Sequence, residues 1–537
     1  MILDSIYTNG RFYTMRSEGE TVEALGVLNG RIVATGTAEE LNRYEARRVV
    51  DLGGRAAIPG LEDTHMHLYL DMLTHQRVDL SSARSWDDVV DLLSAHCEDV
   101  PEGLWFTAEN MNMAKLAEGA YPPREVLDRV PTDVPIIAGS FCHHFHSLNS
   151  AALEACGIDE NFEEEIRGQI ARGEGNRPTG VIRDQAYPQY VQPHIPQPSL
   201  ESNITAMSAY LRELAGYGLT TLQVYQEDNP EGARLYQEIL RIHGPLMRLG
   251  FTWYPDSAND RGIVSGFGNE WLKIGPVKYL SDGGVGGRTA YLWEPYSDDP
   301  STCGEPSFTQ EELDDIVRRR YQEGHELCIH AIGDRAIDMV LDAFRKSYDP
   351  AIGDARRLYL AHCTIPPRDF YEKIEGLPVY PQLSPNWWVN FESFSHDRLG
   401  PEGSERHNRL FPIRDMLDRG VIVQCGSDAP VATVNPWVGI EGAVTRRAVG
   451  SDIPQAAAQA VSVYEALLTY TAYASYYNHE EHEKGTLEPG KWADFAVLTA
   501  DPFAVEPTEL HSLSSWLTVA GGHETFSADT AAQHSHN

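Results

Sequence analysis

The chain has 537 residues, of which 42% are hydrophobic and 9% aromatic, so it can bury a sizeable core in roughly two to four domains. Its 43 basic and 79 acidic side chains give a net charge of −36, which would repel nucleic-acid phosphates. It contains no apolar run of the roughly 18 residues that span a membrane, and Met1–Ser5 does not resemble the start of a secretory signal. We therefore expect a cytoplasmic protein that binds neither nucleic acid nor a membrane.

Short apolar runs separated by turns occur at both ends of the chain. Residues 5–10 and 24–36 contain Asn-Gly pairs, which are hairpin signals, and residues 493–498 and 516–522 have a similar pattern. We expect one composite β-sandwich made of residues 1–57 and 485–526, followed by a polar, disordered tail at 527–537. The charged run 478–483, with His479 and His482, indicates a solvated patch.

Between these ends, apolar strand-like runs alternate with stretches such as 309–323 and 334–346 that are typical of helices. The alternation predicts an α/β fold, a (β/α)8 TIM-type barrel over residues 58–484 flanked by the β-sandwich. The interval from about 70 to 210 is too long for a loop, so we expect an inserted subdomain after strand 1. The candidate strands are 56–62, 218–226, 245–254, 273–281, 326–332, 357–364, 377–384 and 421–427.

Residues of the kind that bind metals stand at the ends of several candidate strands. His65 and His67 follow the first strand, and their spacing lets both imidazoles point to one face. His330, His362 and Asp428 end strands 5, 6 and 8, at the face where such barrels carry catalytic groups. Four imidazoles and one carboxylate suit a divalent ion such as zinc. They exceed the ligands of one tetrahedral zinc, which indicates two ions or one ion beside a free catalytic carboxylate.

Two of these positions have alternative interpretations. Lys278 lies inside the apolar fourth strand, although the chain has only seven lysines. Carboxylation by carbon dioxide would make it an anionic N6-carboxylysine that bridges two ions, whereas the alternative is a structural ion pair. Asp428 could bind metal and accept a proton from water, whose pKa zinc lowers to roughly 7. Its alternative is a helix N-cap, because residues 427–430 resemble a turn into a helix.

Together these motifs resemble the amidohydrolase superfamily, and within it the N-substituted formamide deformylase-like branch. The resemblance implies hydrolysis of an amide-like C–N bond, as in an N-acyl or N-formyl amine, by a metal-activated hydroxide. It implies that the four histidines and Asp428 bind metal, that Lys278 bridges, and that Asp428 moves the proton to the leaving group. It also implies a homodimer. The markers span nearly the whole chain: residues 59–67, 277–290, 330–336, 361–362, 426–431 and 485–494.

Candidates for substrate binding come from three places. His144 precedes an asparagine by five residues, which resembles the spacing of the pocket histidine in this branch, and a surface histidine is the alternative. Asp282 and Arg288 lie in the glycine-rich segment after strand 4, where they could shape the pocket or form a structural ion pair. Trp387, Trp388 and Phe391, near strand 7, could form an apolar pocket for an acyl group or amine, or belong to the core.

The inserted region departs from the branch pattern at three points. Trp105–Asn110 lacks a glycine that is usual there, Phe141–His143 replaces a common Asp-Gly pair, and Asp184 replaces a more usual glutamate. Because this region would line the substrate site, the resemblance defines the catalysis better than the substrate.

Two other functions stay open from the sequence. A mononuclear deaminase of a nitrogenous ring would carry a glutamate just after strand 5 and no lysine in strand 4, whereas His330–Asp334 has no glutamate and Lys278 is present. A non-catalytic scaffold or regulatory protein would be expected to have lost a ligand, and none is missing. We therefore expect a small-molecule hydrolase with one or two divalent ions per chain.

Overall fold

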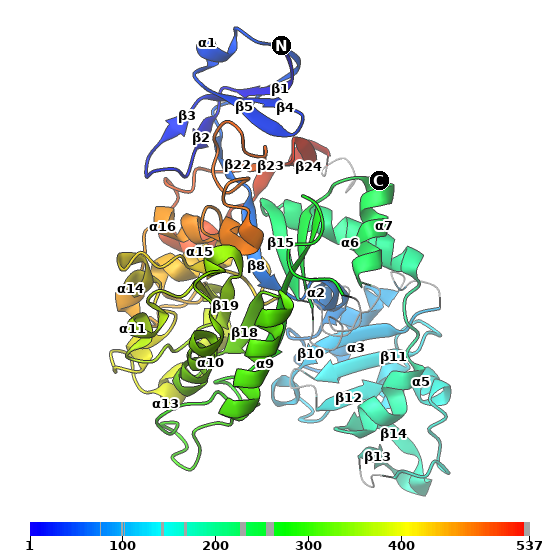
Figure 1. Cartoon of the computed structure of the whole chain (residues 1–537). Helices are drawn as coiled ribbons and strands as arrows, with labels where there is room; N and C mark the ends of the chain where they lie inside the picture. The colour runs from blue at the N-terminus through cyan, green and yellow to red at the C-terminus, as the bar shows by residue number, and fades with distance from the viewer. Residues whose placement is uncertain are drawn as a thin grey trace. The chain divides into compact units, whose positions relative to one another are not determined.

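The computed structural model describes residues 1–75, 77–97, 100, 103–140, 144–165, 169–225, 232–253 and 262–530. The chain divides into two compact units, Met1–Asp71 with Ile204–Asn537, and Met72–Asn203 (Figure 1). The departure at Phe141–His143, the last residues of the candidate strands 218–226 and 245–254, and the tail from 531 lie outside the described residues. In the part of the chain that is described, no helix has the length and apolar character needed to cross a membrane.

The larger unit contains the predicted (β/α)8 barrel, so the fold class is confirmed. Its strands are β8 (Leu61–Met66), β15 (Leu219–Tyr225), β16 (Arg248–Trp253), β17 (Leu272–Leu280), β18 (Leu327–Ala331), β19 (Leu358–His362), β20 (Val379–Leu383) and β21 (Gln424–Cys425). They pair in parallel and in chain order, so each new strand lies beside the preceding one. The carboxyl ends of all the strands therefore meet at one end of the barrel.

Polar contacts between β21 and β8 close the barrel. The hydroxyl of Thr64 donates to the carbonyl of Cys425 at 2.9 Å, and the backbone N–H of Asp428 donates to the carbonyl of His65 at 2.7 Å. A Cβ atom at Gly426 would come within 2.6 Å of the His65 nitrogen, so this close approach requires glycine. The closure fixes His65 and Asp428 relative to each other.

Helices α9 (Gln310–Glu323) and α10 (Asp334–Ser347) pack beside β18 (Figure 1). The predicted start of α9 is set by a capping box, in which Thr309 and Glu312 bond each other's backbone N–H groups. Among the described residues from 200 onward, the other helices are α6 (Leu200–Ala215), α7 (Gly232–His243), α11 (Phe370–Ile374), α12 (Trp388–Phe391), α13 (Ser395–Leu399), α14 (Ile413–Asp418), α15 (Pro436–Thr445) and α16 (Val463–Thr469). The 3-10 turns there are η6 (Gly353–Ala355), η7 (Pro385–Trp387), η8 (His407–Arg409), η9 (Ala457–Gln459), η10 (Ala474–His479) and η11 (Pro507–Ser512).

Strands from both ends of the chain form the flanking β-sandwich. They are β1 (Ile2–Thr8), β2 (Arg11–Tyr13), β3 (Thr21–Val22), β4 (Ala24–Leu28), β5 (Arg31–Gly36), β6 (Glu45–Asp51), β7 (Ala56–Pro59), β22 (Phe495–Leu498), β23 (Ser515–Ala520) and β24 (His523–Ser527), with helix α1 (Ala38–Leu41) after β5. One sheet has the order β5-β4-β1-β6 and the other β24-β23-β22-β7-β2-β3. The rings of Tyr7 and Phe12 pack edge-on against Phe495 in the core between chain ends.

The first candidate strand, residues 56–62, is two strands instead of one. Its first half is β7 of the sandwich, and its second half begins β8 of the barrel. The break falls at Gly60, where a Cβ atom would lie 2.1 Å from the Thr220 hydroxyl oxygen. Because the residues on both sides are apolar and buried, hydrophobicity alone does not reveal the break.

The smaller unit, Met72–Asn203, is the predicted inserted subdomain. Its sheet has the order β13-β14-β12-β11-β10-β9 and contains both parallel and antiparallel pairs. Buried residues on the two faces of this sheet, among them Leu93 and Leu153, belong to separate apolar clusters. Its elements are β9 (Val78–Asp79), α3 (Trp86–Ser94), β10 (Phe106–Met111), η2 (Met113–Lys115), α4 (Arg124–Leu127), β11 (Ile136–Ser140), β12 (Phe145–Leu148), α5 (Ser150–Ala155), β13 (Ile170–Arg172), η3 (Glu174–Asn176), β14 (Pro178–Arg183), η4 (Tyr187–Val191) and η5 (Gln192–His194), and α2 (Leu68–His75) leads into it from β8.

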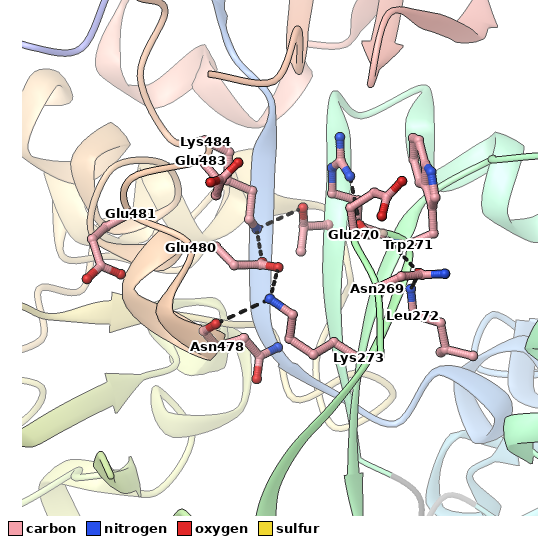
Figure 2. Close-up of polar contacts among 12 residues, drawn as sticks. Asn269, Glu270, Trp271, Leu272, Lys273, Asn478, Glu480, Glu481, Glu483 and Lys484 are labelled. Atoms are coloured by element: carbon pink, nitrogen blue, oxygen red, sulfur yellow. Dashed lines mark hydrogen bonds and ion pairs between the residues drawn. The ribbon is translucent and has the colours of Figure 1, made fainter. Parts of the chain in front are cut away.

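At the amino-terminal ends of the barrel strands lies a buried network of charges (Figure 2). Lys484 contacts Glu62 of β8 and lies 3.1 Å from Glu480, and Lys273 of β17 lies 2.6 Å from the same Glu480. Burial acts to lower the pKa of Lys484, but Glu62 and Glu480 raise it overall. The network therefore holds the segment after η10 against the barrel as paired ions.

This network corrects the expectation of a solvated patch at residues 478–483. His482 is 90% exposed as expected, but Glu480 and Lys484 are buried. His479 bonds the carboxylate of Glu326, which precedes β18, at 2.7 Å. The charges are buried because their partners come from the barrel strands, far away in the sequence.

Candidate metal centre

The six candidate ligands lie at the carboxyl ends of the barrel strands. His65 belongs to β8, His330 to β18 and His362 to the end of β19, while Asp428 follows β21. His362 has φ 69° and Asp428 has φ 58°, in the left-handed region that side chains other than glycine rarely adopt. Such backbone conformations persist where the surrounding structure enforces them, and they are frequent at functional sites.

The distances between candidate ligand atoms suit one small ion. Nε2 of His65 and Nε2 of His67 each lie 3.3 Å from Oδ1 of Asp428. In a tetrahedral zinc site with bonds of about 2.05 Å, neighbouring ligand atoms are about 3.3 Å apart. His362 joins this group, because its ligand atom and those of His65 and Asp428 all lie within 4.8 Å of one another. The structure therefore brings these four side chains together.

Hydrogen bonds select the imidazole nitrogens that are available as ligands. Nδ1 of His65 faces Oε1 of Gln382 at 3.4 Å, and Nε2 of His330 faces the carbonyl of Gly283 at 3.2 Å. Both oxygens accept hydrogen bonds, so these nitrogens carry the protons. The lone pairs therefore remain on Nε2 of His65 and Nδ1 of His330, and this orientation by outer partners is typical of metal-binding histidines.

Burial keeps these imidazoles neutral. It lowers the pKa of His330 to about 4 and the pKa of His65 and His362 well below the ordinary value, and the charge of Lys278 acts in the same direction on all three. A neutral imidazole is the form that binds metal. Nδ1 of His362 is buried and has no hydrogen-bond partner among the described residues, as expected of a group that a further ligand would satisfy.

Lys278 lies inside the same cluster. Its Nζ is 3.1 Å from Nε2 of His65 and 4.4 Å from the centre of the Tyr225 ring. The Tyr225 ring also stacks on His65, with centroids 3.7 Å apart and planes 10° apart. The lysine predicted to become a bridge therefore approaches the ligand atom of His65, and its role as a carboxylated bridge stays a prediction.

Three residues that support the cluster, Gln382, Tyr225 and Asp63, are absent from the sequence prediction. Gln382 accepts from the Tyr225 hydroxyl at 3.2 Å and donates to the carbonyl of Thr64 at 2.9 Å, so it fixes the rings around His65. Asp63 accepts from the backbone N–H of His65 at 2.9 Å, and burial raises its pKa to about 7. The signal that could identify Gln382 is a polar side chain within the apolar run of strand 7.

Asp282 and Arg288 occupy different surroundings. Both carboxylate oxygens of Asp282 accept backbone N–H groups, from Tyr291, Ile332 and Gly333, at 2.9–3.0 Å, and Oδ1 lies 3.5 Å from Nε2 of His330. Burial raises the pKa of Asp282 to about 7. Arg288 pairs with Asp298 at 2.6 Å. Asp282 thus organises the loop behind His330, and substrate contacts by either residue stay a prediction.

His144 lies in the smaller unit, where its Nδ1 is 2.8 Å from Oδ1 of Asp184. Asp184 is the residue that replaces a more usual glutamate, so the shorter acidic side chain still reaches the histidine. Both side chains are about half exposed or more, and the predicted role of His144 in substrate binding stays a prediction.

One of the aromatic candidates reaches the centre directly. The ring of Trp387 stacks on His362 with centroids 4.8 Å apart, and Phe391 stacks behind Trp387 at 5.8 Å. Trp388 is buried and donates to the carbonyl of Gly442, as a core residue does. Trp387 therefore supplies an apolar wall beside a candidate ligand.

Comparison with known proteins identifies the family. Residues 48–526 match the sequence model of the Amidohydrolase family. The chain is 30% identical to "Putative amidohydrolase YtcJ" of Bacillus subtilis (strain 168), over 97% of this chain and 99% of that protein. It is 27% identical to the N-substituted formamide deformylase of Arthrobacter pascens, over 97% of each chain. The chain therefore belongs to the amidohydrolase family, and the resemblance is confirmed.

A solved structure has the same fold. An uncharacterized metal-dependent hydrolase from Pyrococcus horikoshii OT3 superposes with a TM-score of 0.76 at 24% identity, covering 94% of this chain and 99% of that chain. Family membership supports metal-dependent hydrolysis of an amide-like C–N bond as the activity class of this chain.

Proposed function

We propose that the chain hydrolyses the C–N bond of an N-acyl or N-formyl amine with the help of a divalent metal, zinc in the first instance. The observation that carries the proposal is the convergence of His65, His67, His362 and Asp428 at ligand spacing, buried at the catalytic end of the barrel. The identity to an N-substituted formamide deformylase along the whole chain supports the substrate class.

The donor set fits a zinc-like ion. Neutral imidazoles and one carboxylate are ligands that borderline divalent ions prefer, and the contact of His330 Nε2 with Gly283 leaves Nδ1 of His330 available as a further ligand atom. Lys278 as N6-carboxylysine would add an anionic group and permit two ions. When bound, the metal lowers the pKa of water and polarises the scissile carbonyl.

The side chains of this protein would then handle the proton. Asp428 accepts a proton from the attacking water as the new bond forms between the water oxygen and the carbonyl carbon. It returns that proton to the leaving nitrogen as the C–N bond breaks, and the products are a carboxylic acid and an amine. Trp387 provides an apolar surface beside His362 for the acyl or amine part of the substrate. Contacts from His144, Asp282 and Arg288 belong to the same proposal, as does a homodimer in the cytoplasm.

The test combines metal content with a substrate panel. Protein purified without added metal or chelator is analysed for divalent ions per chain and assayed with N-formylbenzylamine, N-acetylbenzylamine and adenine. We expect release of benzylamine, and the catalytic centre should hold one more divalent ion per chain if Lys278 is carboxylated than if it is not. Ammonia release from adenine without amide hydrolysis would replace the proposal with the deaminase alternative, and no metal with no gain on reconstitution would overturn both.

The variant Lys278→Met tests whether the metal content of the catalytic centre depends on a carboxylated Lys278. If the lysine is a carboxylated bridge, the variant loses metal and activity, and bicarbonate enriched in 13C gives a carbamate signal only in the wild type. Lys346→Met is the matched control, because Lys346 is a half-exposed lysine that pairs with Asp314 on the surface. An unchanged metal content in Lys278→Met would remove the bridge from the proposal and leave the hydrolase itself standing.

A further inference from the structure

A second group of metal-binding side chains lies in the segment that follows β20. His396 belongs to α13, His407 belongs to η8, and Glu402 lies between them. One ligand atom from each of the three lies within 4.8 Å of the other two. None of these residues belongs to the candidate metal centre described above, so the group requires its own explanation.

The distances suit a single ion. Oε2 of Glu402 lies 3.0 Å from Nδ1 of His407 and 3.9 Å from Nε2 of His396. These values lie on either side of the separation of about 3.3 Å between neighbouring ligands of tetrahedral zinc. The two imidazole rings face the same carboxylate, with centroids 4.7 Å apart.

The imidazoles need a partner beyond those that the described residues provide. His407 is completely buried, and neither of its ring nitrogens makes a hydrogen bond of normal geometry to a described residue. Nε2 of His396 is buried in the same way. Burial lowers the pKa of His407, and its contacts with Glu402 and Gln455 oppose this only in part. Buried ring nitrogens that lack a well-aligned hydrogen bond are unfavourable, and a metal ion would bind one nitrogen of each ring.

The carboxylate is held in place by the backbone. Oε2 of Glu402 accepts from the N–H of Ala456 at 2.9 Å, and Oε1 accepts from the N–H of Ala457 at 3.0 Å. Such outer hydrogen bonds orient metal-binding carboxylates. The nearby cation, Arg446, donates instead to the carbonyls of Leu410, Phe411 and Gln455, so its hydrogen bonds do not occupy Glu402.

We propose that His396, Glu402 and His407 bind a further divalent ion of the zinc class, which stabilises the segment after β20. Two imidazoles and one carboxylate are a known ligand set for zinc, and the fourth position is open to water. The ion would fasten α13 to η8 and, through Glu402, to the turn at Ala456. The same segment begins at Trp387, which stacks on His362, so the ion stabilises the wall of the catalytic site.

The test is the number of Zn2+ ions that metal-free protein takes up. His396→Gln is the primary variant, because His396 is only half buried and the protein should fold without it. His482→Gln is the matched control, since His482 is a fully solvated histidine. After loading with Zn2+ and gel filtration, we expect one ion fewer per chain in His396→Gln than in the wild type and in the control.

Two further measurements make the result decisive. The rise in melting temperature that Zn2+ produces should be smaller in His396→Gln than in the control, and the visible spectrum of bound Co2+ should lose the contribution of one site. Amide hydrolysis should persist in the zinc-loaded variant, so failure of this site is distinguishable from failure of the catalytic centre. Equal zinc content in all three proteins, with equal melting temperatures, would overturn the proposal.

Discussion

The two ends of the barrel bury titratable side chains in opposite ways. At the amino-terminal end, Lys484 contacts Glu480 (Figure 2) and Glu62. Arg248 pairs with Asp494 at 2.7 Å, so the charges are matched within the protein. At the carboxyl-terminal end, burial keeps His65, His330 and His362 neutral, and these side chains are candidate ligands. Similar burial produces a self-sufficient ionic network at one end and a set of ligands at the other.

The difference shows what each end contributes. A buried charge without a partner is strongly unfavourable. Removing one member of the amino-terminal network would leave such a charge, so each of its side chains should be needed for folding stability. Neutral imidazoles with lowered pKa values avoid that cost and stay available for a ligand, which is the arrangement expected of a functional site. Changes at one end should therefore affect folding, and changes at the other end should affect chemistry.

The largest effect is expected from Asp428→Asn at the carboxyl-terminal end. The amide keeps the shape of the side chain but cannot accept the proton, and it is a poorer ligand. We expect kcat for amide hydrolysis to fall by about 10⁴-fold, or roughly 5 kcal/mol, with little change in urea unfolding. Asp415→Asn, a half-exposed aspartate on α14, is the control. Full activity in Asp428→Asn would refute the proposed role of this residue.

Lys484→Met tests the amino-terminal end. The substitution leaves Glu62 buried without its cation, and we expect the free energy of unfolding to fall by about 4 kcal/mol. The kcat of the folded fraction should not change. Lys346→Met removes an exposed ion pair and should cost less than about 1 kcal/mol. If Lys484→Met lowered kcat while its urea midpoint stayed constant, the functional separation between the two ends would be wrong.

Acidification should lower the folding stability of the metal-free protein, because the buried imidazoles are neutral in the folded state. The folded pKa of His330 is about 4 and its unfolded value is 6.5, so the unfolded chain takes up the proton first as the pH falls. The stability of metal-free protein should thus be complete above pH 6.5 and decrease toward pH 4, by about 3 kcal/mol from this residue. His330→Gln should make the urea midpoint fall less steeply across this range than in the wild type, although His65 and His362 still contribute, and His482→Gln should leave the slope unchanged. A wild-type midpoint that rises on acidification would contradict the argument.

The smallest effect, a modest loss of metal affinity, is expected from a change to Tyr225, which supports the ligand His65. Tyr225→Phe keeps the ring stacked on His65 but removes the hydrogen bond to Gln382, which should cost about 1 kcal/mol. We expect a several-fold weaker metal affinity in competition with a chromophoric chelator. Tyr359→Phe is the control, because the Tyr359 hydroxyl is buried with no hydrogen-bond partner among the described residues. Equal affinities in the two variants would exclude Tyr225 as a positioning residue.

Much of the catalytic end was predictable from the sequence. The strands carrying His330, His362 and Asp428 are short apolar runs, and each polar residue comes where its run ends. In a parallel barrel this placement brings side chains together even though they are far apart in sequence. To predict that these side chains lie close together, only the order of the strands in the barrel was needed. That order follows from the pairing of each strand with the next one in the chain.

The amino-terminal end was not predictable in the same way. The run containing Glu480 and Lys484 has the composition of a solvated surface, and only Glu62 and Lys273 from distant strands make its burial favourable. Gly60 divides β7 from β8 between Pro59 and Leu61, which are both apolar and buried. Charge burial and strand breaks of this kind depend on tertiary partners, which local patterns do not contain.

The pairing of β7 with β22 also determines when the second sheet can form during synthesis of the chain. Ala57 lies opposite Val497 in the sandwich, so the second sheet cannot be completed until the 440 residues after Ala57 have been synthesised. At about 5–20 residues per second, β7 would wait roughly 20–90 s for its neighbour. During that interval an apolar strand has an unpaired edge, so the nascent chain stays prone to aggregation until β22 has been synthesised.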